Sequence, residues 1–188
     1  MQKKYAFVFS CLILVLTMLL VWDSGLTETN FSVIGNRQGQ KVLFLTWGAL
    51  AGNYYYMYME ALMRQAECED RLLRLFLVAS LCLLMAGIGL PYLPKKLPHL
   101  SRLHVCFSFL STVCMALTQM RFLLLLQRRT GAIWKLQWLL QAGIAAGSLG
   151  LLLGIGMVTS LLELFLTAAV CLYLGILRRK LEKIQNNL

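Results

Sequence analysis

Residues 102–126 read RLHVCFSFLSTVCMALTQMRFLLLL, an apolar run in which the only full charges are Arg102 and Arg121. The hydrocarbon core of a bilayer is about 30 Å thick and needs roughly 17–25 helical residues to cross it. Because lipid offers the backbone no hydrogen-bond partners, such a run must be helical. The stretch therefore predicts a transmembrane helix.

Five further runs have the same character, at residues 5–22, 41–63, 72–93, 133–157 and 159–177. The first is too long for a signal peptide, and no small-x-small cleavage motif comes before Asp23, so we interpret it as a retained anchor helix. Gly154, Gly156 and the Thr159-Ser160 pair predict a tight turn between the last two runs. We expect an all-α, polytopic membrane protein: one six-transmembrane-helix bundle over residues 1–188.

Composition and charge support membrane residence. Only 14% of the residues are charged, against about 25% in a soluble domain, and 59% are hydrophobic. The net charge of +10 does not point to nucleic acid, because the basic residues lie in short loops between apolar runs and not on one face of a soluble fold. Such residues set orientation and contact lipid headgroups.

The lysines and arginines predict which end of the bundle faces the cytoplasm. If the N-terminus is cytoplasmic, five of the 18 basic residues fall outside: Arg37, Lys41, Lys95, Lys96 and Arg102. The other thirteen fall inside: Lys3, Lys4, Arg64, Arg71, Arg74, Arg121, Arg128, Arg129, Lys135, Arg178, Arg179, Lys180 and Lys183. The positive-inside rule then predicts a multi-pass protein of the plasma membrane with both termini in the cytoplasm.

Several classes of chemistry lack their motifs. The six cysteines form no CxxC pair, and five of them lie in apolar runs, where cysteine behaves as a small hydrophobe. HExxH, GxSxG and Walker sequences do not occur, and there are only two histidines. We therefore assign no catalytic residue, no metal ligand and no cofactor, and an enzyme is not the favoured reading.

Polar residues form a stripe on the run 102–126. His104, Ser108, Ser111, Met115 and Thr118 follow one another at steps of four, three, four and three, which places them on one helical face. Such a stripe is typical of hydrogen-bonded helix packing. The alternative is the wall of an internal cavity.

Glu163 lies about one turn inside the outer end of the last run. An ionisable residue inside a membrane is a functional candidate whose partner should be named. We name His104, which is predicted at similar depth. Together with Ser108, Ser111 and Asn53, these residues make up a candidate outer-side pocket for a lipid headgroup or small solute. Asn53 is predicted near mid-membrane, where its amide needs a partner. Glu60 is expected to pair with Arg64 at the next turn.

Four glycines form a second stripe, on the run 133–157. Gly143, Gly147, Gly150 and Gly154 are spaced by four, three and four, which lets another helix approach closely. That helix belongs either to the same bundle or to a second copy in a homo-oligomer.

Two short segments carry a resemblance to known proteins. One is FSVIGN at residues 31–36, leading into WG at 47–48, and the other is LHV and FSF at 103–109, after a proline-rich turn. With six short-looped spans, they resemble small uncharacterised bacterial membrane proteins. These are distantly similar to the six-helix superfamily of damage-regulated autophagy modulators and GPI-remodelling proteins. The resemblance implies a six-helix bundle of bacterial origin and no catalytic residues, and it draws attention to His104.

Three other functions compete with headgroup binding. A small-solute or proton-coupled transporter predicts a continuous polar path from His104 past Ser111 and Asn53 toward Glu60. A structural subunit of a membrane complex predicts docking through the glycine stripe. A lipid enzyme would need a nucleophile or a metal beside His104, and the sequence offers neither.

Overall fold

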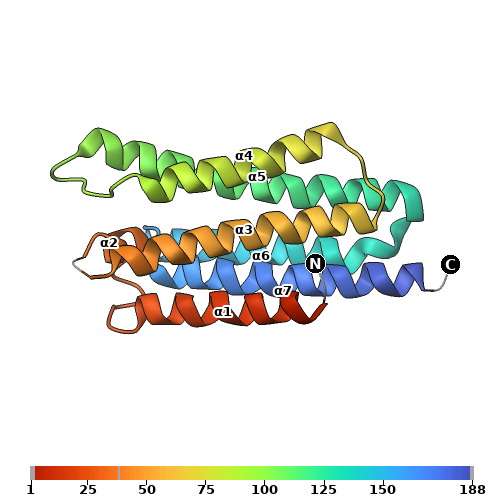
Figure 1. Cartoon of the computed structure of the whole chain (residues 1–188), viewed down its shortest axis with the longest axis horizontal. Helices are drawn as coiled ribbons and strands as arrows, with labels where there is room; N and C mark the ends of the chain where they lie inside the picture. Colours follow the sequence, from red (N-terminus) through yellow and green to blue (C-terminus); the bar gives the residue numbers. More distant parts are fainter. Residues whose placement is uncertain (1–2, 38, 187–188) are drawn as a thin grey trace.

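The computed structural model describes residues 3–37 and 39–186 and is all-α. Its helices are antiparallel neighbours connected at two ends of an elongated bundle (Figure 1). Their bounds are α1 (Lys3–Val21), α2 (Phe31–Gly35), α3 (Lys41–Gln65), α4 (Arg71–Gly89), α5 (Pro98–Thr130), the 3-10 turn η1 (Ala132–Trp134), α6 (Lys135–Ile155) and α7 (Ser160–Gln185).

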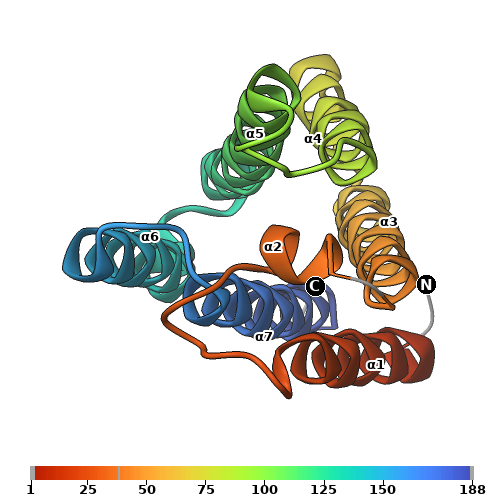
Figure 2. The ribbon, with the colours of Figure 1, turned by 90° about the vertical axis from the view of Figure 1, so that its left-hand side faces the viewer.

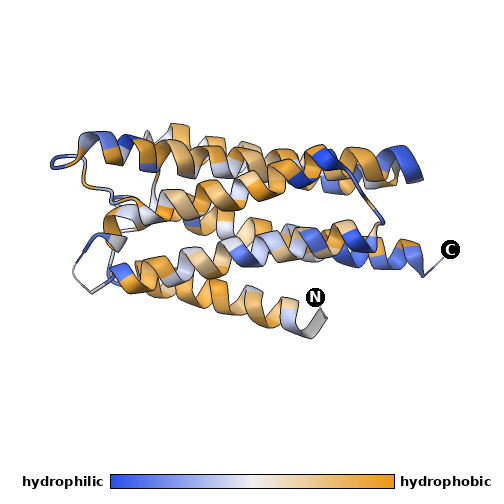
Figure 3. Ribbon diagram, turned by 45° about the horizontal axis from the view of Figure 1, so that its top comes forward, coloured by the Kyte–Doolittle hydropathy of each residue, from blue (hydrophilic) through white to orange (hydrophobic). Residues whose placement is uncertain are grey.

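Four of these helices are long and apolar enough to cross a membrane: α4, α5, α6 and α7. Length and hydropathy therefore support four membrane-spanning helices and not the six that we expected. The apolar part of α1, Tyr5–Val21, is shorter than the other four. In α3 the tyrosines and Asn53 lower the hydropathy. Hydrophilic residues gather toward the two ends of the bundle, as Figure 3 shows.

The turn predicted between the last two apolar runs is confirmed. Gly156 ends α6 in the left-handed region at φ 79°, where its N–H bonds the Leu152 carbonyl. Thr159 caps the N-terminus of α7 and accepts a hydrogen bond from the N–H of Leu162. Because α6 and α7 are separate helices, both ends of the chain lie toward the same side, opposite α2 (Figure 1).

Two helices extend beyond their predicted bounds. Pro98 begins α5 at a position that suits proline, because the first helical N–H needs no partner within the helix. α7 continues past residue 177 because Leu181 is buried in the core and Ile184 packs against it. With 26 residues, α7 is about 39 Å long and exceeds the hydrocarbon thickness.

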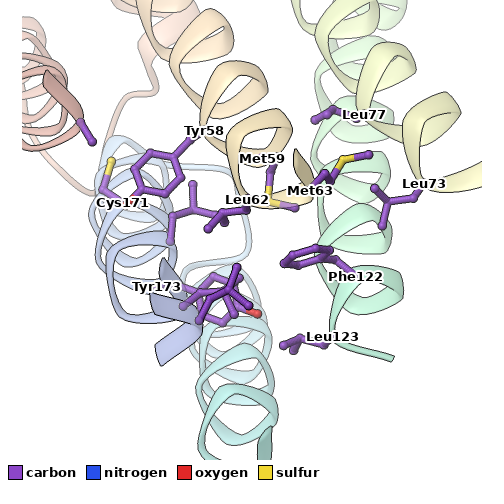
Figure 4. Close-up of a cluster of buried hydrophobic side chains, with 14 of the residues drawn as sticks. Tyr58, Met59, Leu62, Met63, Leu73, Leu77, Phe122, Leu123, Cys171 and Tyr173 are labelled. Atoms are coloured by element: carbon purple, nitrogen blue, oxygen red, sulfur yellow. The ribbon is translucent and has the colours of Figure 1, made fainter. Parts of the chain in front are cut away.

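The buried apolar residues form two clusters. The larger joins α3, α4, α5 and α7 near the end that carries the chain termini, with Met59, Met63, Leu73 and Phe122 at its centre (Figure 4). The smaller lies at the opposite end, around α2. Seen from that end, the long helices surround α2 (Figure 2). We call the two ends of the bundle the α2 end and the terminal end.

Candidate functional site

The α2 end is built around a helix that cannot stand alone. Five residues are too few for a stable isolated helix, so packing must hold α2 in place. Phe31 and Ile34 are fully buried in the smaller apolar cluster, and the ring of Phe31 meets that of Trp47 edge-on at 4.9 Å. A Cβ added to Gly35 would lie 2.5 Å from the ring of Phe44, so only glycine allows this approach.

Glu163 holds the beginning of α2. Its Oε2 accepts a hydrogen bond from the backbone N–H of Phe31 at 2.6 Å. The Asn30 side chain accepts from the N–H of Val33 at 2.9 Å. The first N–H groups of any helix have no partner within it, and here these two side chains supply the acceptors. Glu163 thus acts from α7 as a cap for a different helix.

The loop before α2 in turn supplies hydrogen-bond acceptors for the first N–H groups of α7. The carbonyl of Thr29 accepts from the N–H of Ser160 at 2.7 Å, and that of Leu26 accepts from the N–H of Leu161 at 2.9 Å. The hydroxyl of Ser160 also donates to the Thr29 carbonyl, at 3.0 Å. These bonds join the loop and α7 in both directions, which fixes α2 over the bundle.

His104 joins α5 to both α4 and α2. It is 3% exposed, and its Nδ1 lies 2.7 Å from the Gly87 carbonyl and 3.1 Å from the Leu90 carbonyl. Because carbonyls only accept, Nδ1 carries the proton and donates. In the neutral ring Nε2 then accepts from the hydroxyl of Ser32, at 2.6 Å. His104 therefore donates to the Leu90 carbonyl and to the Gly87 carbonyl, which also accepts from the N–H of Leu90 at 3.1 Å, and it anchors α2.

The structure brings His104 and Glu163 to one place, but not to each other. They hold consecutive residues of α2, Ser32 and Phe31. The first turn of α2 therefore lies where the sequence predicted a pocket shared by the two side chains.

Ser111 and Ser108 serve close helix packing, as the simpler reading of the polar stripe predicts. Ser111 donates to the Ser80 carbonyl at 2.8 Å, and Ser80 donates to the Ser111 carbonyl at 3.0 Å. A Cβ added to Gly87 would lie 2.8 Å from the Ser108 hydroxyl. These contacts tie α4 to α5 along their length.

Asn53 and Glu60 lie apart from this group. Asn53 is exposed, and its amide donates to the Ala49 carbonyl of its own helix at 2.8 Å. The structure therefore does not bring Asn53 to His104 or Glu163. The predicted pairing of Glu60 with Arg64 is confirmed, at 3.1 Å.

A groove of about 540 Å³ lies beside His104, on the outer surface of α5. Tyr92 connects the two, because its ring lies 5.5 Å from that of His104. Arg102 supplies the positive charge of the groove. The lining residues are Tyr92, Pro94, Pro98, Ser101, Arg102, Val105, Cys106 and Phe109.

Ser101 fixes the turn that overhangs this groove. Its hydroxyl accepts from the N–H of Leu93 at 2.9 Å and donates to the Leu97 carbonyl at 3.0 Å. Our sequence reasoning missed the groove. The available signal was the proline-rich turn followed by Arg102, Val105 and Phe109 at steps of three and four, on one helical face.

Among the residues that the structure describes, one glycine of the α6 stripe packs against another helix. A Cβ added to Gly147 would lie 2.8 Å from the ring of Phe165 on α7. Around Gly143, Gly150 and Gly154 no atom lies within 4 Å of such a Cβ. Gly147 thus lies against α7, whereas the other three positions face open space.

At the terminal end, Arg121 has a role that the sequence did not reveal. Its guanidinium donates to both carboxylate oxygens of Asp70, at 2.8 and 2.7 Å. Asp70 also caps α4 by accepting from the N–H of Leu73 at 2.7 Å. The hydrogen bonds from Arg121 lower the pKa of the Asp70 carboxyl to about 2.

Within residues 3–37 and 39–186, no group of three His, Cys, Asp or Glu side chains is placed to hold a metal ion. Comparison of the chain with protein-family models, curated proteins and solved structures finds no match.

Proposed function

We propose that this chain is an integral protein of a bacterial plasma membrane, a single bundle with six spans and both termini in the cytoplasm. α1 and α3 would cross together with the four longer apolar helices. The thirteen-to-five division of basic residues supports this orientation, as does the position of both chain ends opposite α2. Six antiparallel spans also fit the distant resemblance to the six-helix superfamily.

At the α2 end, we propose that the protein binds the headgroup of an anionic lipid. The groove beside Tyr92 carries this proposal, because it combines one exposed cation with an apolar floor. A lipid phosphate would contact Arg102, while its acyl chain would lie along Val105 and Phe109. These two side chains are exposed on the surface of α5 that would face the bilayer.

His104 and Glu163 would position this site and would not themselves bind the lipid. His104 holds the end of α4, from which the overhanging turn starts, and its ring contacts Tyr92. Glu163 and His104 together hold α2 over the bundle. The exposed position of Asn53 favours headgroup binding over a transporter, because the polar path proposed for transport needs Asn53 inside.

The test is lipid binding by purified protein in neutral detergent, measured by native mass spectrometry with phosphatidylglycerol and phosphatidylcholine. Replacing Arg102 with glutamine should weaken phosphatidylglycerol binding about fivefold, since one basic residue near a membrane contributes about 1 kcal/mol. Lys41→Gln, which removes an exposed charge at the same end outside the groove, is the matched control. Equal binding by the Arg102 and Lys41 variants would refute the proposed site.

A second role, as a subunit that associates with another copy, is supported by one observation. Gly143, Gly150 and Gly154 face open space on α6, which is a surface that a second helix could approach closely. Cysteine cross-linking at Gly150→Cys in native membranes tests this role. A cross-linked dimer supports it, and its absence under conditions that cross-link a known dimer contradicts it.

A further inference from the structure

A second pocket lies at the terminal end, between α3 and α7. Its volume is about 200 Å³, and it is lined by Tyr58, Ala61, Leu62, Gln65 and Arg178. Figure 4 shows Tyr58 and Leu62 on the side of α3 that faces α7. The pocket is thus far from the groove beside Tyr92, and it shares no residue with that groove.

Arg178 is held in this pocket with part of its guanidinium unused. Its side chain is 15% exposed, and Nε donates to Glu182 at 3.1 Å. The guanidinium carbon lies over the ring of Tyr58, 5.9 Å from its centre. Among the described residues, the buried Nη1 has no hydrogen-bond partner. Glu182 and Tyr58 therefore fix the guanidinium, and Nη1 is a buried donor without an acceptor among the described residues.

The far wall of the pocket is also fixed. The Gln65 side chain donates to the Gln185 amide oxygen at 2.8 Å, and the Gln185 amide donates to the Gln65 carbonyl at 2.6 Å. This reciprocal pair joins the last turns of α3 and α7. The pocket is therefore bounded by side chains that are already held in place.

The charge around the pocket favours an anion. Glu182 offsets the charge of Arg178, but Arg179, Lys180 and Lys183 follow on the same helix. A guanidinium matches the oxygen atoms of phosphate and carboxylate groups better than an ammonium does, because its N–H groups form a rigid fork. We propose that this pocket binds a phosphate group through Arg178, either on a lipid of the adjacent leaflet or as a free ion.

Isothermal titration calorimetry of the full-length protein in neutral detergent tests the proposal. The probes are dioctanoyl phosphatidic acid, inorganic phosphate and dioctanoylglycerol, which lacks a phosphate. Titrations use an Arg102→Gln background, so that the groove at the α2 end contributes less to the measured binding. Binding of both phosphate probes identifies a general phosphate site, and binding of phosphatidic acid alone identifies a lipid headgroup site.

Two variants and one control separate this site from general charge effects. Arg178→Gln should weaken binding at least tenfold, because the charge-assisted donor is lost. Ala61→Phe, which fills the pocket and leaves Arg178 intact, should weaken it similarly if the glutamine variant does not fold. Arg179→Gln removes a neighbouring exposed charge and should change affinity less than twofold. No phosphate binding, or equal losses at Arg178 and Arg179, would overturn the proposal without affecting the site at the α2 end.

Discussion

Glu163 accepts a hydrogen bond from the backbone N–H of Phe31, a residue 132 positions earlier in the chain, at 2.6 Å. This bond connects the first turn of α7 to the first turn of α2. His104 holds the next residue, Ser32, from α5. Glu163 and His104 therefore converge on one short helix, which gives both a role in positioning it.

Removing the Glu163 acceptor should loosen α2. In Glu163→Ala the buried N–H of Phe31 loses its partner, which costs about 1–3 kcal/mol. Glu163→Gln keeps a carbonyl oxygen at the same place and should cost less. Thermal unfolding in detergent measures the stability, and limited proteolysis of residues 22–30 measures the loosening. Equal stability of the alanine variant and the wild type would contradict the capping role.

His104 and Ser32 should be energetically coupled. His104→Ala also removes a donor from the carbonyls of Gly87 and Leu90, so this variant should lose more stability than Ser32→Ala. A double-mutant cycle isolates the contact between the two side chains. Hydrogen-bonded neighbours show coupling of about 0.5–3 kcal/mol. A coupling energy near zero would mean that His104 serves α4 alone.

The pair of Asp70 and Arg121 predicts a pH dependence. The folded-state pKa of Asp70, about 2, is below the 3.8 of an unperturbed aspartate side chain. The folded state therefore binds this proton less readily than the unfolded state, so the pair stabilises the fold above about pH 4. This contribution should be lost as the pH falls from about 4 to 2.

Two substitutions at Asp70 separate the stabilising effect of its charge from that of its capping hydrogen bond to α4. Asp70→Asn keeps an oxygen to cap α4, so it should remove the pH dependence between 4 and 2 and retain the cap. Asp70→Ala should in addition lose about 1 kcal/mol for the cap. Unfolding in detergent at pH 2, 3, 4 and 6 gives the comparison. The same acid sensitivity in wild type and Asp70→Asn would show that other groups cause it.

A large side chain on α6 should be tolerated at Gly150 but not at Gly147. Gly147→Leu places a side chain against the ring of Phe165, so it should displace α6 from α7 and destabilise the protein by about 1–3 kcal/mol. A Cβ added to Gly150 has no neighbouring helix or side chain within 4 Å, so Gly150→Leu should leave the isolated chain unaffected. The two unfolding temperatures, compared at one protein concentration, provide the test. Equal losses would mean that both glycines are packed.

The sequence predicted the positions of the helices better than the contacts between them. Apolar runs and turn residues located every long helix to within a few residues, apart from the C-terminal end of α7, because hydropathy and helix breakers act locally. The amphipathic end of α7 was missed because its apolar face appears only at helical spacing. The sequence also placed His104 and Glu163 at the same end, because their depth follows from their distance to the predicted turns.

The partners of polar residues could not be read from the sequence. α2 has only five residues, so its place depends on contacts from α5 and α7 that no local pattern specifies. The bond from Arg121 to Asp70 depends on how α5 lies beside the turn before α4. In α6, the buried residues are Gln137 and Gln141, whereas Leu136, Leu139, Leu149 and Leu153 are exposed. Such an inverted face suits a helix in lipid, where apolar residues need no burial.

The six-span arrangement is tested most directly by labelling single cysteines with a membrane-impermeant maleimide in intact cells. In a variant whose six native cysteines are replaced, the labelled positions would be Glu28→Cys, Glu69→Cys and Lys96→Cys, all exposed in loops between helices. We predict that positions 28 and 96 react in intact cells, and that position 69 reacts only after permeabilisation. Labelling of positions 28 and 69 from the same side would show that α3 does not cross the membrane, and would contradict the six-span account.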